Sequence, residues 1–280
     1  MESKNGAKTE KRPPKILLIL MFLFFSSVFV VSLYHVFSYF YQGAQQSNLN
    51  ESMIEEGIET LEPNTTQAVL VPITLPSGIT ESVLVQTTPD ISVDFSKLQK
   101  KYPKMVGWLY SQDKKYNHPI MQTRDNSYYV THLPDGRVNH AGSLFLDCRD
   151  PSDFSAWNHV IYGHNMANGS MFGDLLEYQN RDYFKQHPYL FYFTEQKTYR
   201  LEVFSAFFTT TESIVYTRPD TVEKKQEFLS HALKNSAFNA GISVSESDSV
   251  LVLSTCSTSN IRDNNRFVVI AKLVPLESGN

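Results

Sequence analysis

The 280-residue sequence contains only two cysteines, Cys148 and Cys256, which are too few for a disulfide framework. A chain of this length can bury enough apolar surface to fold without disulfides, so each cysteine is either structural or a working thiol. We expect Cys148, at the end of an apolar run, to be structural; a bridge between the two cysteines is the alternative. No His, Cys, Asp or Glu residues recur at the spacing of metal ligands, so we expect no metal and no other cofactor.

Basic residues are scarce beyond position 41. The first 41 residues hold five Lys or Arg and two acids, which leaves 20 basic and 27 acidic residues in the rest of the chain. This remainder has no basic stripe, and such a stripe is the usual footprint of a protein that binds nucleic acid. The composition therefore argues against nucleic acid as a partner.

Charge is absent from residues 16–37, which include no Asp, Glu, Lys or Arg. A helix needs about 20 apolar residues to cross a bilayer. Because basic residues precede this segment and aromatic residues end it, we expect a single-pass anchor over 16–41 with the basic tail 1–15 in the cytoplasm. A cleaved signal peptide is the alternative, but its apolar region is usually shorter and ends in small residues.

Periodic apolar patterns are rare in residues 42–90, which are rich in Gln, Asn, Ser, Thr, Glu and Pro. We expect this segment to be an extracellular stalk. Residues 91–276 contain many short apolar or alternating runs separated by clusters of Asn, Asp, Gly and Pro. This pattern predicts a mainly β domain, either a barrel or a sandwich.

Two helical inserts interrupt the predicted strands. One lies around residues 171–178 and the other spans 221–238. In the second, four apolar residues are spaced as one face of a helix: Phe228, Leu229, Ala232 and Leu233.

Cys256 ends an apolar run and is followed by polar residues, which places it where a buried strand reaches a loop. Arg266 begins the next apolar run, so the two strands predict a hairpin that brings these residues close. A guanidinium beside a thiol favours the thiolate and can stabilise an oxyanion. The alternatives are a buried structural cysteine and a solvated arginine, and Arg262 competes for the same role.

His164 follows a short apolar run, and Gly163 allows the backbone to turn just before it. The imidazole is therefore predicted at the junction of a strand and a loop, a position suited to a general acid/base. Seven other histidines compete with it. His159 is the nearest, but on a strand a separation of five residues puts it on the opposite face.

The motifs around these residues resemble those of the class B sortases. The cysteine motif reads Leu-Ser-Thr-Cys at 253–256, the histidine motif reads Tyr-Gly-His-Asn-Met at 162–166, and Arg266 follows at the spacing of that class. The resemblance extends to Gly-Trp at 107–108, the run 125–130 and the run 142–147. It covers roughly residues 92–275.

The resemblance implies a sortase-type barrel of eight strands with N-terminal helices and a helical insert before the cysteine strand. It also implies a membrane-anchored cysteine transpeptidase on the surface of a Gram-positive bacterium. In this family the thiolate attacks the carbonyl of a Thr in a C-terminal sorting signal, and a thioacyl enzyme forms. An amine of a peptidoglycan precursor or of a pilin then accepts the surface protein.

Residue roles follow from the same resemblance. Cys256 would be the nucleophile, His164 the acid/base and Arg266 the oxyanion stabiliser. Five residues would contact the substrate: Asn126, Val130, Tyr162, Ser254 and Thr255. Barrel packing is the alternative for Val130 and Tyr162, and turn chemistry is the alternative for Asn126.

Two other functions are alternatives to the transpeptidase. A papain-like cell-wall endopeptidase would also employ Cys and His, but it usually places the cysteine first in the chain and on a helix. Here His164 precedes Cys256, and Cys256 ends a predicted strand. A non-catalytic, stalked binding module would form no covalent intermediate. The motifs favour the transpeptidase over both.

Overall fold

The structure is a computed structural model that describes residues 15–62, 67–74, 80–256 and 264–276 of the chain. The chain divides into two compact units, one ending at Gln45 and the other beginning at Gln46. Arg262 and the residues beside it lie outside the described parts of the chain, as does the side chain of Cys256.

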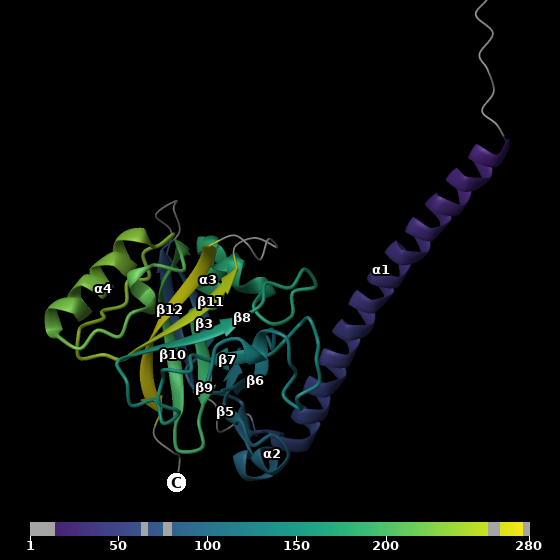
Figure 1. Ribbon diagram of the computed structural model, residues 1–280. Coiled ribbons are helices and arrows are strands. Elements are labelled where there is room, and N and C mark those ends of the chain that lie inside the picture. The colour runs from purple at the N-terminus through teal and green to yellow at the C-terminus, as the bar shows by residue number, and fades with distance from the viewer. Residues whose placement is uncertain (1–14, 63–66, 75–79, 257–263, 277–280) are drawn as a thin grey trace, which may run out of the picture. The chain divides into compact units, whose positions relative to one another are not determined.

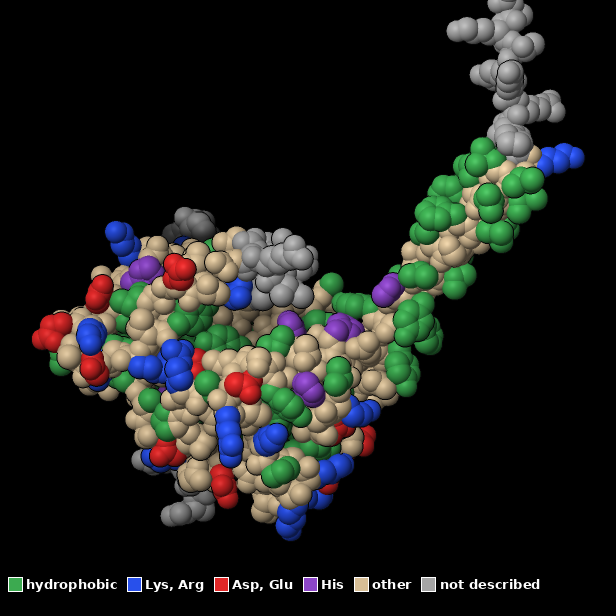
Figure 2. Space-filling view, viewed as in Figure 1, with side chains coloured by type: hydrophobic (Ala, Val, Ile, Leu, Met, Phe, Trp, Pro, Cys, Tyr) green, Lys and Arg blue, Asp and Glu red, His purple; other side chains and the backbone are tan. Residues whose placement is uncertain are grey.

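Helix α1 (Lys15–Gly57) contains the whole uncharged segment. The apolar side chains of this segment are exposed, Phe22 and Phe37 by 71% and 69%, and Figure 2 shows hydrophobic side chains crowded along it. The helix is long and apolar enough to cross a membrane. Exposure of so many large apolar side chains is expected only where lipid or another protein covers them.

The last turns of α1 belong to the second unit. Met53 is fully buried in a cluster that includes Ile91, Phe95 and Leu98. The side-chain amide of Asn50 donates a hydrogen bond of 3.0 Å to the carbonyl of Asn117. Residues 46–57 are therefore part of the folded domain.

Between α1 and the barrel lie four short strands and one helix. Strand β1 (Ile58–Thr60) pairs with β4 (Ile91–Val93), and β2 (Ala68–Thr74) forms a hairpin with β3 (Thr80–Gln86). Helix α2 (Phe95–Lys101) follows, and the Asp94 carboxylate accepts a hydrogen bond of 2.9 Å from the Lys97 amide at its N-terminus.

Eight strands close into a barrel in the order β10-β12-β11-β8-β7-β6-β5-β9 (Figure 1). This confirms the predicted eight-stranded barrel. The strands are β5 (Met105–Tyr110), β6 (Asn117–Met121), β7 (Leu144–Leu146), β8 (Asn158–Gly163), β9 (Tyr189–Phe193), β10 (Thr198–Thr210), β11 (Val250–Cys256) and β12 (Asn265–Leu276).

The first four residues of strand β11 (250–253) are all apolar because both faces of the strand are covered there. Leu251 and Leu253 belong to the largest core cluster, whereas Val250 and Val252 pack in a second cluster with Phe228 of α4. A strand buried on both faces reads as a continuous apolar run, which is the pattern that marked it in the sequence.

The predicted helical inserts are both present. The first is the 3-10 helix η3 (Gly173–Gln179), followed by α3 (Arg181–Gln186), and the second is α4 (Val222–Asn235). Leu233 was predicted on the buried face of the second insert, but it is 49% exposed. Successive helical residues are about 100° apart, so Leu233 lies at the rim while Ala232 is buried. Two more 3-10 turns, η2 (Tyr128–Val130) and η4 (Ile214–Tyr216), lie in loops.

Candidate active site

Strands β8 and β11 run parallel and bring two of the predicted residues to the same end of the barrel. Their register pairs Tyr162 with Ser254 and Gly163 with Thr255. His164 and Cys256 each follow that last pair by one residue. Since neighbouring strands lie about 4.8 Å apart, the backbones at these two positions are close.

Strand β12 brings the third residue. It runs antiparallel to β11, and the register places Arg266 directly opposite Cys256. The two strands are therefore neighbours, as the predicted hairpin requires, and Cα atoms of directly opposed residues are about 4.5–5.5 Å apart. Cys256 thus has β8 on one side and Arg266 on the other.

The His164 ring is fixed by one hydrogen bond. Its Nε2 atom lies 2.7 Å from the carbonyl oxygen of Val130, which ends η2. A carbonyl oxygen can only accept, so Nε2 carries the hydrogen. Nδ1 is therefore the ring nitrogen that can take or give a proton.

A cleft of about 560 Å³ opens at this end of the barrel. It is lined by His164, Arg266 and all five residues predicted to contact substrate. The complete lining is Asn126, Val130, Phe145, Arg149, Tyr162, Gly163, His164, Thr211, Glu212, Ser213, Tyr216, Thr217, Ser254, Thr255 and Arg266.

Several cleft residues also make structural hydrogen bonds. The Asn126 side-chain oxygen accepts from the Cys148 amide at 2.7 Å, and the Thr255 hydroxyl donates to the Gly163 carbonyl at 2.9 Å. Thr255 therefore reinforces the junction of β11 with β8. Cys148 has a free, half-buried thiol.

One wall of the cleft was not predicted from the sequence. It comes from residues 211–217, the segment that includes η4 and precedes α4. Tyr216 lies in this wall, and its hydroxyl is 2.8 Å from that of Ser254. Nothing in the local pattern of this polar loop marks it as part of a site, because its position depends on pairing between β10 and β12.

Burial and hydrogen bonding shift the pKa values of three residues in or near the cleft. Burial raises the pKa of Tyr162, and its hydrogen bond to the Asp147 carboxylate raises it further. Burial alone would raise the pKa of Asp147, but hydrogen bonds from Arg149 and Tyr162 outweigh that effect and hold it below its ordinary value. Burial raises the pKa of Asp150 to about 6.

Comparison with known proteins defines the family. Residues 115–274 match the model of the sortase domain, which is more than half of the chain. The chain therefore belongs to the sortase family.

The most informative relatives are all sortase B proteins. Sortase B of Listeria monocytogenes is 35% identical over 187 residues, which cover 66% of this chain and 76% of that protein. The Staphylococcus aureus sortase B–substrate complex is 28% identical with a TM-score of 0.62, covering 65% of this chain and 85% of that one. A sortase B structure complexed with triglycine is 27% identical with a TM-score of 0.63, covering 65% and 86%.

These likenesses assign the chain to class B, and its activity is that of a cysteine transpeptidase. The barrel and the family membership therefore exclude the two alternative interpretations of the sequence, a papain-like endopeptidase and a non-catalytic binding module.

Proposed function

We propose that Cys256 is the nucleophile, His164 the general acid/base and Arg266 the group that stabilises the oxyanion. One observation carries this assignment. The strand register sets Cys256 opposite Arg266. Cys256 and His164 each follow the Thr255–Gly163 pair by one residue, and a cleft of about 560 Å³ opens at this end of the barrel.

The first half-reaction forms a thioester. The Cys256 thiolate attacks the carbonyl carbon of a Thr in the sorting signal, and the carbonyl electrons move to the oxygen, whose negative charge faces the Arg266 guanidinium. When the oxyanion collapses, the C–N bond breaks. His164, as imidazolium, gives a proton to the leaving amine from Nδ1.

The second half-reaction transfers the acyl group to an amine. The incoming amine attacks the thioester carbon, His164 takes a proton from it, and the C–S bond breaks to restore the thiolate. The hydrogen bond from Nε2 to Val130 is kept throughout, so the ring does not need to turn between the two steps.

The cleft is proposed to hold the sorting signal of a surface protein. Asn126, Val130, Tyr162, Ser254 and Thr255 all line it. The likeness to a substrate-bound sortase B supports a peptide in this cleft, and the likeness to a sortase B complexed with triglycine supports an amine as acceptor. We take the amine of a peptidoglycan precursor or of a pilin as that acceptor.

The location of the reaction is proposed from α1. An uncharged segment long enough to cross a bilayer would hold the enzyme as a single-pass protein of the cell membrane. The basic residues before it favour a cytoplasmic N-terminus, which leaves the catalytic domain outside the cell, where sorting signals and wall precursors are available.

The test is to trap the acyl enzyme. We would incubate the full chain in detergent with a library of sorting-signal peptides and identify the adduct by mass spectrometry. The expected result is an adduct on Cys256 that is lost in Cys256→Ala and kept in the matched control Cys148→Ser. An adduct on Cys148, or hydrolysis that persists in Cys256→Ala, would overturn the assignment.

A further inference from the structure

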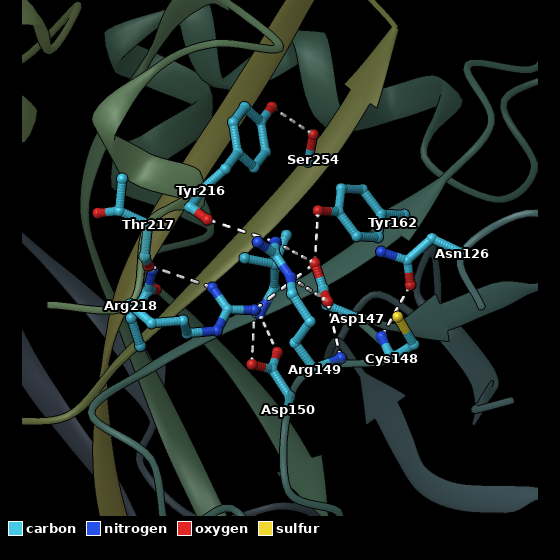
Figure 3. Close-up of polar contacts among 12 residues, drawn as sticks. Asn126, Asp147, Cys148, Arg149, Asp150, Tyr162, Tyr216, Thr217, Arg218 and Ser254 are labelled. Carbon is cyan, nitrogen blue, oxygen red and sulfur yellow. Dashed lines mark hydrogen bonds and ion pairs between the residues drawn. The ribbon is translucent and has the colours of Figure 1, made fainter. Parts of the chain in front are cut away.

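A buried carboxylate lies behind the cleft without lining it. The Asp147 side chain is fully buried just after β7. Its Oδ2 accepts a hydrogen bond of 2.9 Å from the Tyr162 hydroxyl, and its two oxygens accept hydrogen bonds of 2.9 and 2.7 Å from Nε and Nη2 of Arg149 (Figure 3). Both partners line the cleft. One buried group therefore holds two side chains that face the substrate.

Through Arg149, the same group also reaches the wall formed by residues 211–217. The Arg149 Nη2 donates to the Tyr216 carbonyl at 3.3 Å. The rings of Tyr162 and Tyr216 are stacked, with centroids 6.2 Å apart and planes 19° from parallel. The wall formed by β8 and the wall formed by η4 therefore share one anchor.

The charges of this network are balanced. Arg218 lies 2.6 Å from Asp150 and 3.5 Å from Asp147, so two buried carboxylates face two arginines. A buried ion pair contributes little net stability, because desolvation offsets most of the attraction. The network is thus better explained by the geometry that it fixes than by the stability that it adds.

We propose that Asp147 is a positioning residue for acylation, which sets the two tyrosine-bearing walls of the cleft through its bonds to Tyr162 and Arg149. This inference rests on the proposed function of Cys256. Asp147 is not among the described residues that line the cleft. It determines where the sorting signal lies relative to the thiolate, and small displacements of a reacting group reduce the rate strongly.

The experiment compares acylation with simple alkylation of the same thiol. In the full chain, Asp147→Asn keeps the shape of the side chain but removes its charge. Acylation by a sorting-signal peptide should fall about tenfold or more, as for loss of a hydrogen bond to a charged group. Alkylation of Cys256 by iodoacetamide, which does not use the cleft walls, should keep the wild-type rate. An unchanged acylation rate, or equal loss in both reactions, would overturn the proposal.

Asp113→Asn is the matched control, because Asp113 also pairs with a side chain, His187 at 2.9 Å, but His187 is not among the residues that line the cleft, unlike the partners of Asp147. It should leave both reactions at the wild-type rate. Acylation of the wild-type chain tests the proposed function of Cys256 by itself, because the wild-type chain carries no change at Asp147.

A second variant tests the same hydrogen bond without disturbing the ion pairs. Tyr162→Phe keeps the ring and removes the hydroxyl that donates to Asp147. Acylation should again fall, and the double variant with Asp147→Asn should lose less than the product of the two single losses, because both act through one bond. Multiplicative losses, or normal acylation by Tyr162→Phe, would show that the bond does not position the substrate.

Discussion

At the scale of single residues, the hydrogen bond between His164 and Val130 has a mechanistic meaning. It fixes which ring nitrogen carries a hydrogen and leaves Nδ1 available for the proton transfer that we propose. His164→Gln keeps a polar side chain that cannot exchange this proton. We expect both half-reactions to slow by about 10²–10⁴-fold in pre-steady-state measurements of acylation and transfer. Rapid acylation by this variant would contradict the role given to His164.

The arginine opposite Cys256 leads to a second prediction. Arg266→Lys retains the charge but loses the planar fork that can point two donors at one oxygen. We expect kcat to fall by about 10²–10³-fold, as when an oxyanion donor is removed. Arg262→Lys is the matched control, and the peptide-cleavage assay should find it close to wild type. The reverse result would transfer the role to Arg262.

Individual residues show how far sequence reasoning reached. Cys256, His164 and Arg266 were predicted as catalytic residues because motifs surround them and because strand ends predict exposure. Tyr216 and Arg149 were missed, although both line the cleft. Their places depend on loops fixed by contacts distant in sequence, such as the bond from Arg149 to the Tyr216 carbonyl, and no local pattern encodes such contacts.

At the scale of elements, the junction of β8 with its following loop depends on a glycine. A Cβ at Gly163 would collide with the side chains of Leu144 and Phe172. We expect Gly163→Ala to lower the free energy of unfolding by about 1–3 kcal/mol, as overpacking does. Because His164 is the next residue, acylation should also fall. Urea unfolding and peptide cleavage check both effects, and unchanged values in both would contradict this packing.

The elements also divide by how well the sequence predicted them. Strand β11 was predicted from an apolar run and helix α4 from an amphipathic pattern. Both patterns are local signals that a short stretch of sequence contains. The closed barrel of eight strands was expected only from the family resemblance, and the order of its strands was not predicted. Parallel pairing of β8 with β11 joins segments separated by both helical inserts, so periodicity alone cannot reveal it.

At the scale of the whole molecule, the division of the chain predicts how it can be shortened. A protein beginning at Gln46 keeps the buried Met53 and should fold as a soluble enzyme. One beginning at Ile91 loses Met53, and we expect its free energy of unfolding to be lower by about 2–5 kcal/mol, as for deletion of a buried side chain. Chemical unfolding of both proteins measures this, and equal stability would show that residues 46–90 add nothing to the stability of the domain.

Stability should also depend on pH through two buried histidines. Burial lowers the pKa of His118 and of His159 to about 4, from an ordinary value of 6.5. Their stabilising effect is complete above pH 6.5 and is lost as the pH falls towards 4, because the unfolded chain takes up protons first. The raised pKa of Asp150, about 6, acts in the opposite direction over part of this range.

Because two histidines oppose one carboxylate, we expect a net fall in the free energy of unfolding between pH 6.5 and 4. Urea unfolding across this range measures it. Replacing both His118 and His159 by asparagine, which does not titrate here, should flatten the profile or reverse its slope. A double variant with the same acid loss as the wild type would assign the loss to other groups.

The pairing of β8 with β11 has a consequence for the timing of activity. The Thr255 hydroxyl and the Gly163 carbonyl that it contacts are 92 residues apart in the sequence. Contacts of such long range form late, after the entropy cost of closing the intervening loop has been met. Under the roles proposed for Cys256 and His164, a newly made chain carries its thiol without the basic partner, and we expect its reactivity to begin only when the barrel closes.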